Sequence, residues 1–121
     1  KIGLGIMGWA TMLGFLGIPY NSEEATELAR RVMGFIYESA KEESISLAKE
    51  RGVFPAWKRS VWENRGIRIR NATLTTVAPT GSISIIAGPT STGIEPVCSL
   101  CYFRNILDGE KLLEVDPAFE Y

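Results

Sequence analysis

Histidine is absent from this chain of 121 residues, and its absence excludes several kinds of site. Without an imidazole there is no Ser-His-Asp or Cys-His machinery, no His-ligated metal and no His proton shuttle. Two cysteines are too few for a disulfide scaffold or a four-ligand zinc site. The 13 basic residues do not outnumber the 14 acidic ones, and the net charge is −1. That balance argues against a protein that holds nucleic acid on a broad basic surface.

The composition is that of a globular protein, with 45% apolar and 22% charged residues. The chain enters an apolar stretch directly after Lys1, and it closes just after Pro117 and an apolar pair. We therefore expect residues 1–121 to form an incomplete part of a larger domain.

Residues 2–18 carry no charge and contain five glycines. Because glycine weakens an isolated helix, we interpret this stretch as a buried helix of a large protein and not as a membrane span.

A long amphipathic helix is expected over residues 22–51, where apolar residues recur at spacings of three and four. Asn21 and Glu24 resemble a capping box at its start, and Gly52 suits its end. The elements after it are expected to be short: a connector at 53–66, a strand at 73–77, a helix at 82–87, and strands at 97–107 and 111–115 joined by a turn at Asp108-Gly109.

Three glycines, Gly3, Gly5 and Gly8, match the spacing of the dinucleotide-binding fingerprint. That fingerprint requires a preceding strand, and only two residues precede Gly3. We interpret these glycines as helix-packing positions.

Two further patterns, a pair of cysteines and a run of basic residues, are weak evidence for a functional site. Cys98 and Cys101 have redox spacing, but an extended chain places their Cα atoms about 10 Å apart, too far for a disulfide. We interpret both as small buried hydrophobes. The basic run Lys58, Arg59, Arg65, Arg68 and Arg70 is interpreted as a solvated connector, because Trp57 and Trp62 are too few to make a nucleic-acid surface.

The strongest chemical signal is the turn from the predicted strand into the helix after it. Its residues are Thr80, Gly81, Ser82, Ile83 and Ser84. The start of a helix leaves several N–H groups unpaired at the positive end of the helix dipole. Gly81 has no Cβ to keep an anion from the backbone, and the three hydroxyls can donate further hydrogen bonds. This pattern predicts a phosphate-binding turn, although an ordinary N-cap at Thr80 is the alternative.

Several sequence blocks resemble the large subunit of ribonucleotide reductases, most closely the adenosylcobalamin-dependent class. These blocks are Arg70-Asn71-Ala72-Thr73, the run of residues 78–88 and Gly93-Ile94-Glu95-Pro96. The opening residues 2–8, the helix end at 47–52 and Arg104-Asn105 also look like that family. The likeness covers nearly the whole chain.

The resemblance implies an α/β fold, in which this chain is a C-terminal fragment of a ten-stranded α/β barrel: long helices, then short strands and a C-terminal hairpin. It implies an oxidoreductase that converts ribonucleotides to 2′-deoxyribonucleotides by thiyl-radical chemistry for DNA replication. Residues 80–84 are then expected to anchor the phosphates of a ribonucleoside di- or triphosphate. The expected cofactor is adenosylcobalamin, bound mainly by parts outside this chain. The expected partners are the remainder of the reductase chain and other copies in a homo-oligomer, without nucleic acid or membrane, in the cytoplasm.

The catalytic parts of that family are not found in this sequence. Its finger-loop Asn-x-Cys-x-Glu pattern is absent, and neither Cys98 nor Cys101 stands where an active cysteine is expected. We therefore assign no catalytic residue here and expect the segment to be inactive alone. Two alternatives stay open. One is a non-catalytic split subunit that completes a barrel with a partner chain, and the other is an autonomous phosphate-binding module.

Overall fold

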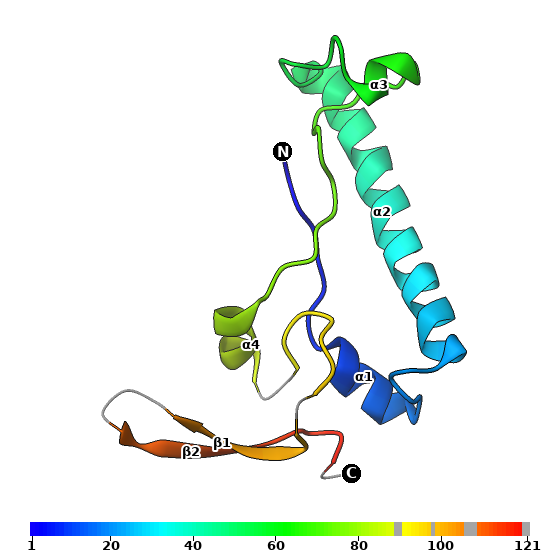
Figure 1. The fold of residues 1–121 in the computed structure, drawn as a ribbon. Coiled ribbons are helices and arrows are strands. Elements are labelled where there is room, and N and C mark those ends of the chain that lie inside the picture. The colour runs from blue at the N-terminus through cyan, green and yellow to red at the C-terminus, as the bar shows by residue number, and fades with distance from the viewer. Residues whose placement is uncertain (89–90, 98, 106–108, 120–121) are drawn as a thin grey trace. The chain divides into compact units, whose positions relative to one another are not determined.

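A computed structural model describes residues 1–88, 91–97, 99–105 and 109–119. The elements in chain order are α1 (Trp9–Leu16), α2 (Glu23–Arg51), α3 (Val61–Asn64), α4 (Gly81–Ala87), β1 (Cys101–Asn105) and β2 (Lys111–Val115) (Figure 1). The chain divides into two compact units, Lys1–Gly5 with Leu28–Thr76, and Ile6–Glu27 with Val77–Tyr121. Each unit is described by itself.

In the first unit, the N-terminal segment is extended and runs parallel to the segment that leads toward α4 (Figure 1). The Leu4 N–H donates to the Leu74 carbonyl at 2.8 Å, and the Thr76 N–H donates back to the Leu4 carbonyl at 2.9 Å. A Cβ added at Gly5 would lie 2.7 Å from the Thr76 carbonyl oxygen, so the backbones approach too closely for a side chain. The prediction of one helix over residues 2–18 is therefore wrong for its first half, because glycines at every second position let two extended segments pair.

Helix α2 confirms the predicted long helix, and Figure 1 shows it as one continuous rod. Its cap differs from the prediction: the Ser22 hydroxyl, not Asn21, accepts the Ala25 N–H at 3.1 Å. Ser22 offers the shorter side chain directly before the first helical residue, so its oxygen reaches the first free amides. The helix is followed by Gly52 with a φ of +74°, as the sequence predicts.

A small core forms where the expected connector folds back on α2. Trp62, Ile69 and Leu74 are its buried members. Trp62 lies on α3, a short helix that the sequence analysis missed, and the Ser60 hydroxyl caps that helix by accepting the Trp62 and Glu63 N–H groups. The Trp62 indole N–H donates to the Ala72 carbonyl at 3.0 Å, so a large apolar ring is buried without an unpaired donor.

Residues 70 and 71, which lie between two of these core residues, are tied to α2 through Ser44, which is only 1% exposed. The Ser44 hydroxyl donates to the Asn71 side-chain oxygen at 2.8 Å and accepts the Asn71 N–H at 2.9 Å. The Arg70 N–H donates to the Ser44 carbonyl at 3.0 Å. These bonds fix the start of residues 73–77, which are extended but form only an isolated bridge between Thr75 and Leu4, so the predicted strand is wrong at this place.

In the second unit, α1 begins after Gly8 and ends before Gly17, both with positive φ. Strands β1 and β2 pair antiparallel, with Cys101 opposite Val115 and Asn105 opposite Lys111, which confirms the predicted hairpin. Asp108 of the predicted turn lies outside the described residues, and Gly109 has the positive φ expected of it. Among the helices of the described residues, none combines the length and apolar character needed to cross a membrane.

Candidate functional site

The predicted phosphate-binding turn joins an extended segment to α4, and α4 confirms the expected short helix. Thr80 precedes the helix in the left-handed region, with a φ of 53°. That conformation is uncommon for a β-branched residue, so the surrounding contacts must hold it. Beyond its chain neighbours and the backbone of α4, a Cβ built on Gly81 has no described atom within 4 Å, so the surface in front of this residue is open.

The backbone amides at the start of α4 are the hydrogen-bond donors that this turn offers to an anion. Within the described residues, no hydrogen bond takes the N–H groups of Gly81, Ser82 or Ile83, and the Ser84 N–H donates to the Thr80 carbonyl at 3.0 Å. No charged side chain occurs between residues 77 and 94. An anion held at this turn would therefore be bound by backbone dipoles and hydroxyls, without a lysine or arginine from the same segment.

The three predicted hydroxyl donors differ in what the fold does with them. Ser84 is only 2% exposed, and its hydroxyl donates to the Gly81 carbonyl at 3.0 Å. The Thr80 hydroxyl oxygen accepts the N–H of Gly93 at 2.7 Å. Ser82 is exposed. The hydroxyls of Ser84 and Thr80 thus form hydrogen bonds within the protein that stabilise the turn, while Ser82 is exposed to solvent.

Gly93 belongs to this arrangement, although the residue-by-residue reading of the sequence assigned it no role. It is buried, lies 13 residues after Thr80 and has a φ of +46°. The signal that could have found it is the Gly93-Ile94-Glu95-Pro96 block, which the sequence analysis noted only as a family resemblance.

Gly3, Gly5 and Gly8, which have the spacing of the dinucleotide-binding fingerprint and are interpreted from the sequence as helix-packing positions, do not share one role in the structure. Gly3 and Gly5 allow the close parallel pairing in the first unit. At the start of α1, the Gly8 N–H donates to the Ser91 carbonyl at 2.9 Å and the Trp9 N–H to the Gly93 carbonyl at 3.3 Å. The amides that would face a pyrophosphate are therefore already bonded within the protein.

The basic run is used for structure. One guanidinium nitrogen of Arg70 lies 3.4–3.5 Å from the carbonyl oxygens of Arg51, Gly52 and Val53, where α2 ends. Arg65 stacks over the Trp62 ring at 5.8 Å, and Arg68 over the Trp57 ring at 5.9 Å. The Arg70 cation stabilises α2, because a positive charge at a helix C-terminus interacts favourably with the negative end of the helix dipole. The run is therefore more than the solvated connector that the sequence predicts.

The cysteines and the acidic residues form no recognisable reactive centre in the described part of the chain. Cys101 begins β1 as an exposed free thiol, contrary to the prediction that it is buried, because its strand belongs to a two-stranded hairpin. Cys98 lies outside the described residues. Among the described residues, no three His, Cys, Asp or Glu side chains gather as a metal site would require.

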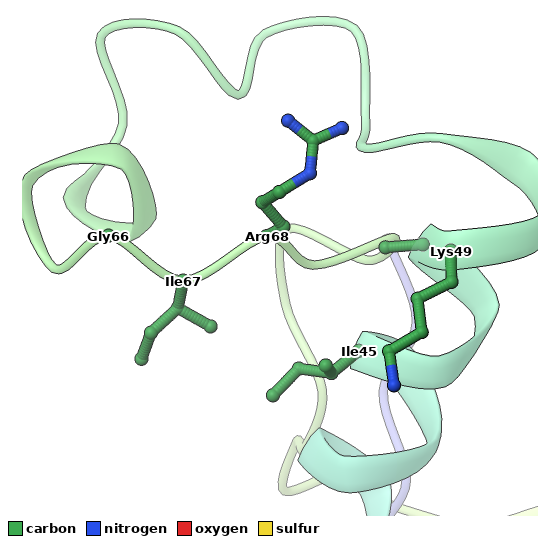
Figure 2. Close-up of a pocket in the computed structure, with 6 residues that line it drawn as sticks. Ile45, Lys49, Gly66, Ile67 and Arg68 are labelled. Carbon is green, nitrogen blue, oxygen red and sulfur yellow. The ribbon is translucent and has the colours of Figure 1, made fainter.

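Two cavities lie in the first unit, and neither is lined by residues 80–84. One, of about 570 Å³, is lined by Ile45, Ala48, Lys49, Gly66, Ile67 and Arg68. In Figure 2, Ile67 and Arg68 extend to opposite sides of their backbone, and Ile45 projects from α2. The other, of about 370 Å³, is lined by Ser44 and Asn71 and otherwise mainly by apolar side chains, Phe35 among them. Neither lining contains a cysteine, so the radical chemistry implied by the resemblance has no reactive group there.

A family model described as "Ribonucleotide reductase, barrel domain" matches residues 1–69 and 64–121. The chain belongs to this family. The resemblance read from the sequence blocks is thereby confirmed, and the fold class is confirmed as far as a reductase barrel domain.

Two relatives are especially similar to this reductase segment. The vitamin B12-dependent ribonucleoside-diphosphate reductase of Thermoplasma acidophilum is 58% identical over 120 residues, which are 99% of this chain and 16% of that protein. The enzyme of the same description from Mycobacterium tuberculosis strain H37Rv is 53% identical over 120 residues, 99% of this chain and 17% of its own. The chain therefore spans about a sixth of the length of these relatives.

A solved structure has a similar fold. The Actinobacillus ureae class Id ribonucleotide reductase alpha subunit matches with a TM-score of 0.72 and 29% identity, over 98% of this chain and 19% of that subunit. The described elements are thus those of one region of a reductase large subunit.

Proposed function

We propose that this chain is part of a ribonucleotide reductase large subunit of the adenosylcobalamin-dependent type, which converts ribonucleoside diphosphates to 2′-deoxyribonucleoside diphosphates. In this proposal the chain contributes to the wall of a ten-stranded α/β barrel in a cytoplasmic homo-oligomer. The high identity to two vitamin B12-dependent ribonucleoside-diphosphate reductases supports the cofactor type and the substrate class.

The role proposed for residues 80–84 is to hold the substrate's phosphates. The observation that carries it is the set of three amides at Gly81, Ser82 and Ile83, which donate no hydrogen bond to the described residues and open onto a surface without a Cβ at Gly81. A hydrogen bond to a charged acceptor contributes about 1.5–3 kcal/mol net, so several together can hold a diphosphate. The exposed Ser82 hydroxyl adds a further donor to the same turn.

Anchoring the phosphates serves chemistry at the other end of the substrate. In the radical reaction implied by the family, a thiyl radical takes the ribose 3′ hydrogen, the 2′-hydroxyl leaves, and a cysteine pair supplies electrons. The finger-loop pattern that bears the thiyl cysteine is absent from this sequence. This chain's own contribution is to bind and orient the substrate, because misplacement by about 1 Å can slow such a step about a hundredfold.

Adenosylcobalamin finds no fitting site in the described residues. The cavities of about 570 and 370 Å³ are open hollows of mostly apolar lining, too small for a corrin with its nucleotide tail. We derive no step through the cofactor from this chain and propose that its contacts lie on other parts of the subunit.

The proposed function predicts a specific pattern of turnover. Full-length reductase supplied with adenosylcobalamin and a dithiol should reduce a ribonucleoside diphosphate, and the 121-residue chain alone should not. The parent ribonucleoside should be poorer in kcat/KM by roughly a hundredfold, since binding energy at the phosphates supports the chemical step. The measurement is chromatographic quantification of the product, a deoxyribonucleoside diphosphate from the diphosphate and a deoxyribonucleoside from the ribonucleoside.

The same experiment separates the alternatives. Turnover by the 121-residue chain alone would contradict the assignment. Activity that returns only when the chain is mixed with a separate upstream polypeptide would favour a split subunit. Tight nucleotide binding by a stable monomer of the chain would favour an autonomous binding module.

A further inference from the structure

The end of α2 and the segment after it carry much of the chain's positive charge. Residues 49–70 hold seven of the 13 basic residues and two of the 14 acidic ones, although the whole chain has a net charge of −1. One of those two carboxylates, Glu63, accepts the backbone N–H of Arg59. Within the described residues, no carboxylate forms an ion pair with any of these seven cations. This region therefore has an excess of positive charge that the described part of the chain does not neutralise.

The fold uses some of these cations and leaves no aromatic ring for a nucleic acid. Arg70 lies against the carbonyl groups that end α2, while Arg65 and Arg68 each lie over a tryptophan ring. In the described structure, no aromatic side chain of residues 49–70 is exposed. Single-stranded nucleic acids need exposed aromatic rings on which their bases stack. The excess positive charge therefore favours an acidic protein segment as its partner.

The cavity of about 570 Å³ lies within this region, and we name it the basic hollow after its lining residues Ile45, Ala48, Lys49, Gly66, Ile67 and Arg68. Its apolar floor is fixed, because Ile45 and Ile67 pack against the buried core and Ala48 is only 4% exposed. The Ile67 N–H donates to the Trp62 carbonyl at 2.9 Å, and the Ile67 carbonyl accepts the Trp57 indole N–H at 2.8 Å. A floor held in this way does not have to be ordered when a partner binds.

Lys49 and Arg68 add two exposed positive charges to the lining of the basic hollow. In Figure 2, the ammonium group of Lys49 and the guanidinium group of Arg68 point in different directions. They therefore do not converge on one compact anion such as a phosphate. Each of them can instead meet a separate carboxylate of a segment that crosses the hollow. Such a segment would place an apolar side chain on the floor, and the charges would fix its register.

We propose that the basic hollow is the docking site for an acidic segment in the remainder of the reductase subunit. An apolar side chain of that segment packs on Ile45, Ala48 and Ile67, and its carboxylates pair with Lys49 and Arg68. The inference rests on the proposed function, which places this chain in a longer subunit. The chain spans 16–17% of the length of its relatives, so most of such a subunit lies outside it. A segment of the same polypeptide has a high effective concentration at the hollow, so modest ion pairs suffice to hold it.

Zero-length cross-linking of the full-length reductase tests this docking. A carbodiimide joins the Lys49 amine to a contacting carboxylate as an amide and leaves as a urea, and peptide mass spectrometry identifies the carboxylate. Mixing isotope-labelled and unlabelled subunits before assembly separates links within one subunit from links between two. Lys58 is the internal control, because it is exposed in the same basic region but does not line the hollow. Lys49→Arg keeps the charge and cannot form the amide, so the link should disappear in that variant.

We expect Lys49 to link to an Asp or Glu outside residues 1–121 of the same subunit, next to an apolar residue, and Lys58 to give no such link. In Lys49→Glu/Arg68→Glu, the linked segment should take up deuterium about tenfold faster, because two attractions become repulsions. Lys58→Glu should leave that uptake unchanged. If the double variant does not fold, Lys49→Glu alone should give an increase of about threefold. Replacing the linked carboxylate with lysine in Lys49→Glu should restore slow uptake.

Three outcomes overturn the inference. If Lys49 gives no link, or links only within residues 1–121, the basic hollow is a solvated surface. If its links join only labelled to unlabelled peptides, a second copy occupies the hollow. If Lys58→Glu accelerates deuterium uptake as much as Lys49→Glu does, the effect is one of overall charge. Failure of the proposed function is seen separately, because the same preparation would then not reduce a ribonucleoside diphosphate, whatever links it forms.

Discussion

Replacing Gly81 with valine in the full-length reductase should weaken ribonucleoside diphosphate binding roughly 10- to 100-fold. The branched Cβ would stand in front of the N–H groups at the start of α4 and prevent one of them from reaching a phosphate. Each lost hydrogen bond to a charged acceptor is worth about 1.5–3 kcal/mol, and tenfold in affinity corresponds to about 1.4 kcal/mol. Isothermal titration with the diphosphate and with the parent ribonucleoside measures the effect, which should be confined to the diphosphate.

The fold makes this substitution a clean test. Apart from its two chain neighbours and the backbone of α4, no described atom lies within 4 Å of a Cβ at Gly81, so a side chain there begins in open space. Gly34 in α2 has equally open surroundings, so Gly34→Val serves as the matched control. The control should bind the diphosphate as wild type does. Unchanged diphosphate affinity in Gly81→Val would remove the proposed role of the turn.

Replacing Gly5 with alanine should destabilise the parallel pairing of the N-terminal segment. The new Cβ would lie 2.7 Å from the Thr76 carbonyl oxygen, and a backbone atom cannot yield as the end of a flexible side chain does. Overpacking of this kind costs about 1–3 kcal/mol. Hydrogen exchange followed by mass spectrometry should show faster exchange at the Leu4 and Thr76 amides, together with a lower unfolding temperature.

A glycine-to-alanine substitution in α2 is expected to raise the stability of the protein, whereas Gly5→Ala lowers it. Gly34 lies inside the helix with open space around it, so Gly34→Ala should stabilise the protein by about 1 kcal/mol through helix propensity.

Protection of the Leu4 amide in Gly5→Ala equal to that of wild type would show that the two extended segments do not pair as described.

Local signals explain what the sequence predicted well. The spacing of apolar residues and the glycine at position 52 located α2, and Asp108-Gly109 with its flanking apolar residues located the hairpin. In both cases the determining residues lie within a few positions of the element they form. The family of the chain was also readable, because the blocks at residues 70–73, 78–88 and 93–96 occur together.

The errors arise where a partner is distant in the sequence. Residues 2–5 are extended because they pair with residues 73–76, and no local rule separates that from a glycine-rich helix. The alternation of Gly3 and Gly5 is the one hint, since residues two apart share a face of an extended chain. The roles of Arg70 at the end of α2 and of Trp62 in the core depend equally on contacts that only folding brings together.

The candidate site divides along the same line. The amides of Gly81, Ser82 and Ile83, which donate to no described residue, follow from a local turn into a helix, so the sequence could locate them. The use of the Thr80 hydroxyl depends on Gly93, 13 residues away, and the burial of Ser84 depends on the packing of α4. Side chains that look like equivalent donors in sequence therefore have different roles in the fold.

The most direct test is a crystal structure of the full-length reductase with a ribonucleoside diphosphate bound. Phosphate oxygens should lie about 2.7–3.2 Å from the backbone nitrogens of Gly81, Ser82 and Ile83, with the Thr80 hydroxyl still bonded to the Gly93 amide. A diphosphate held by other residues, with these three amides facing only water, would contradict the assignment of the site.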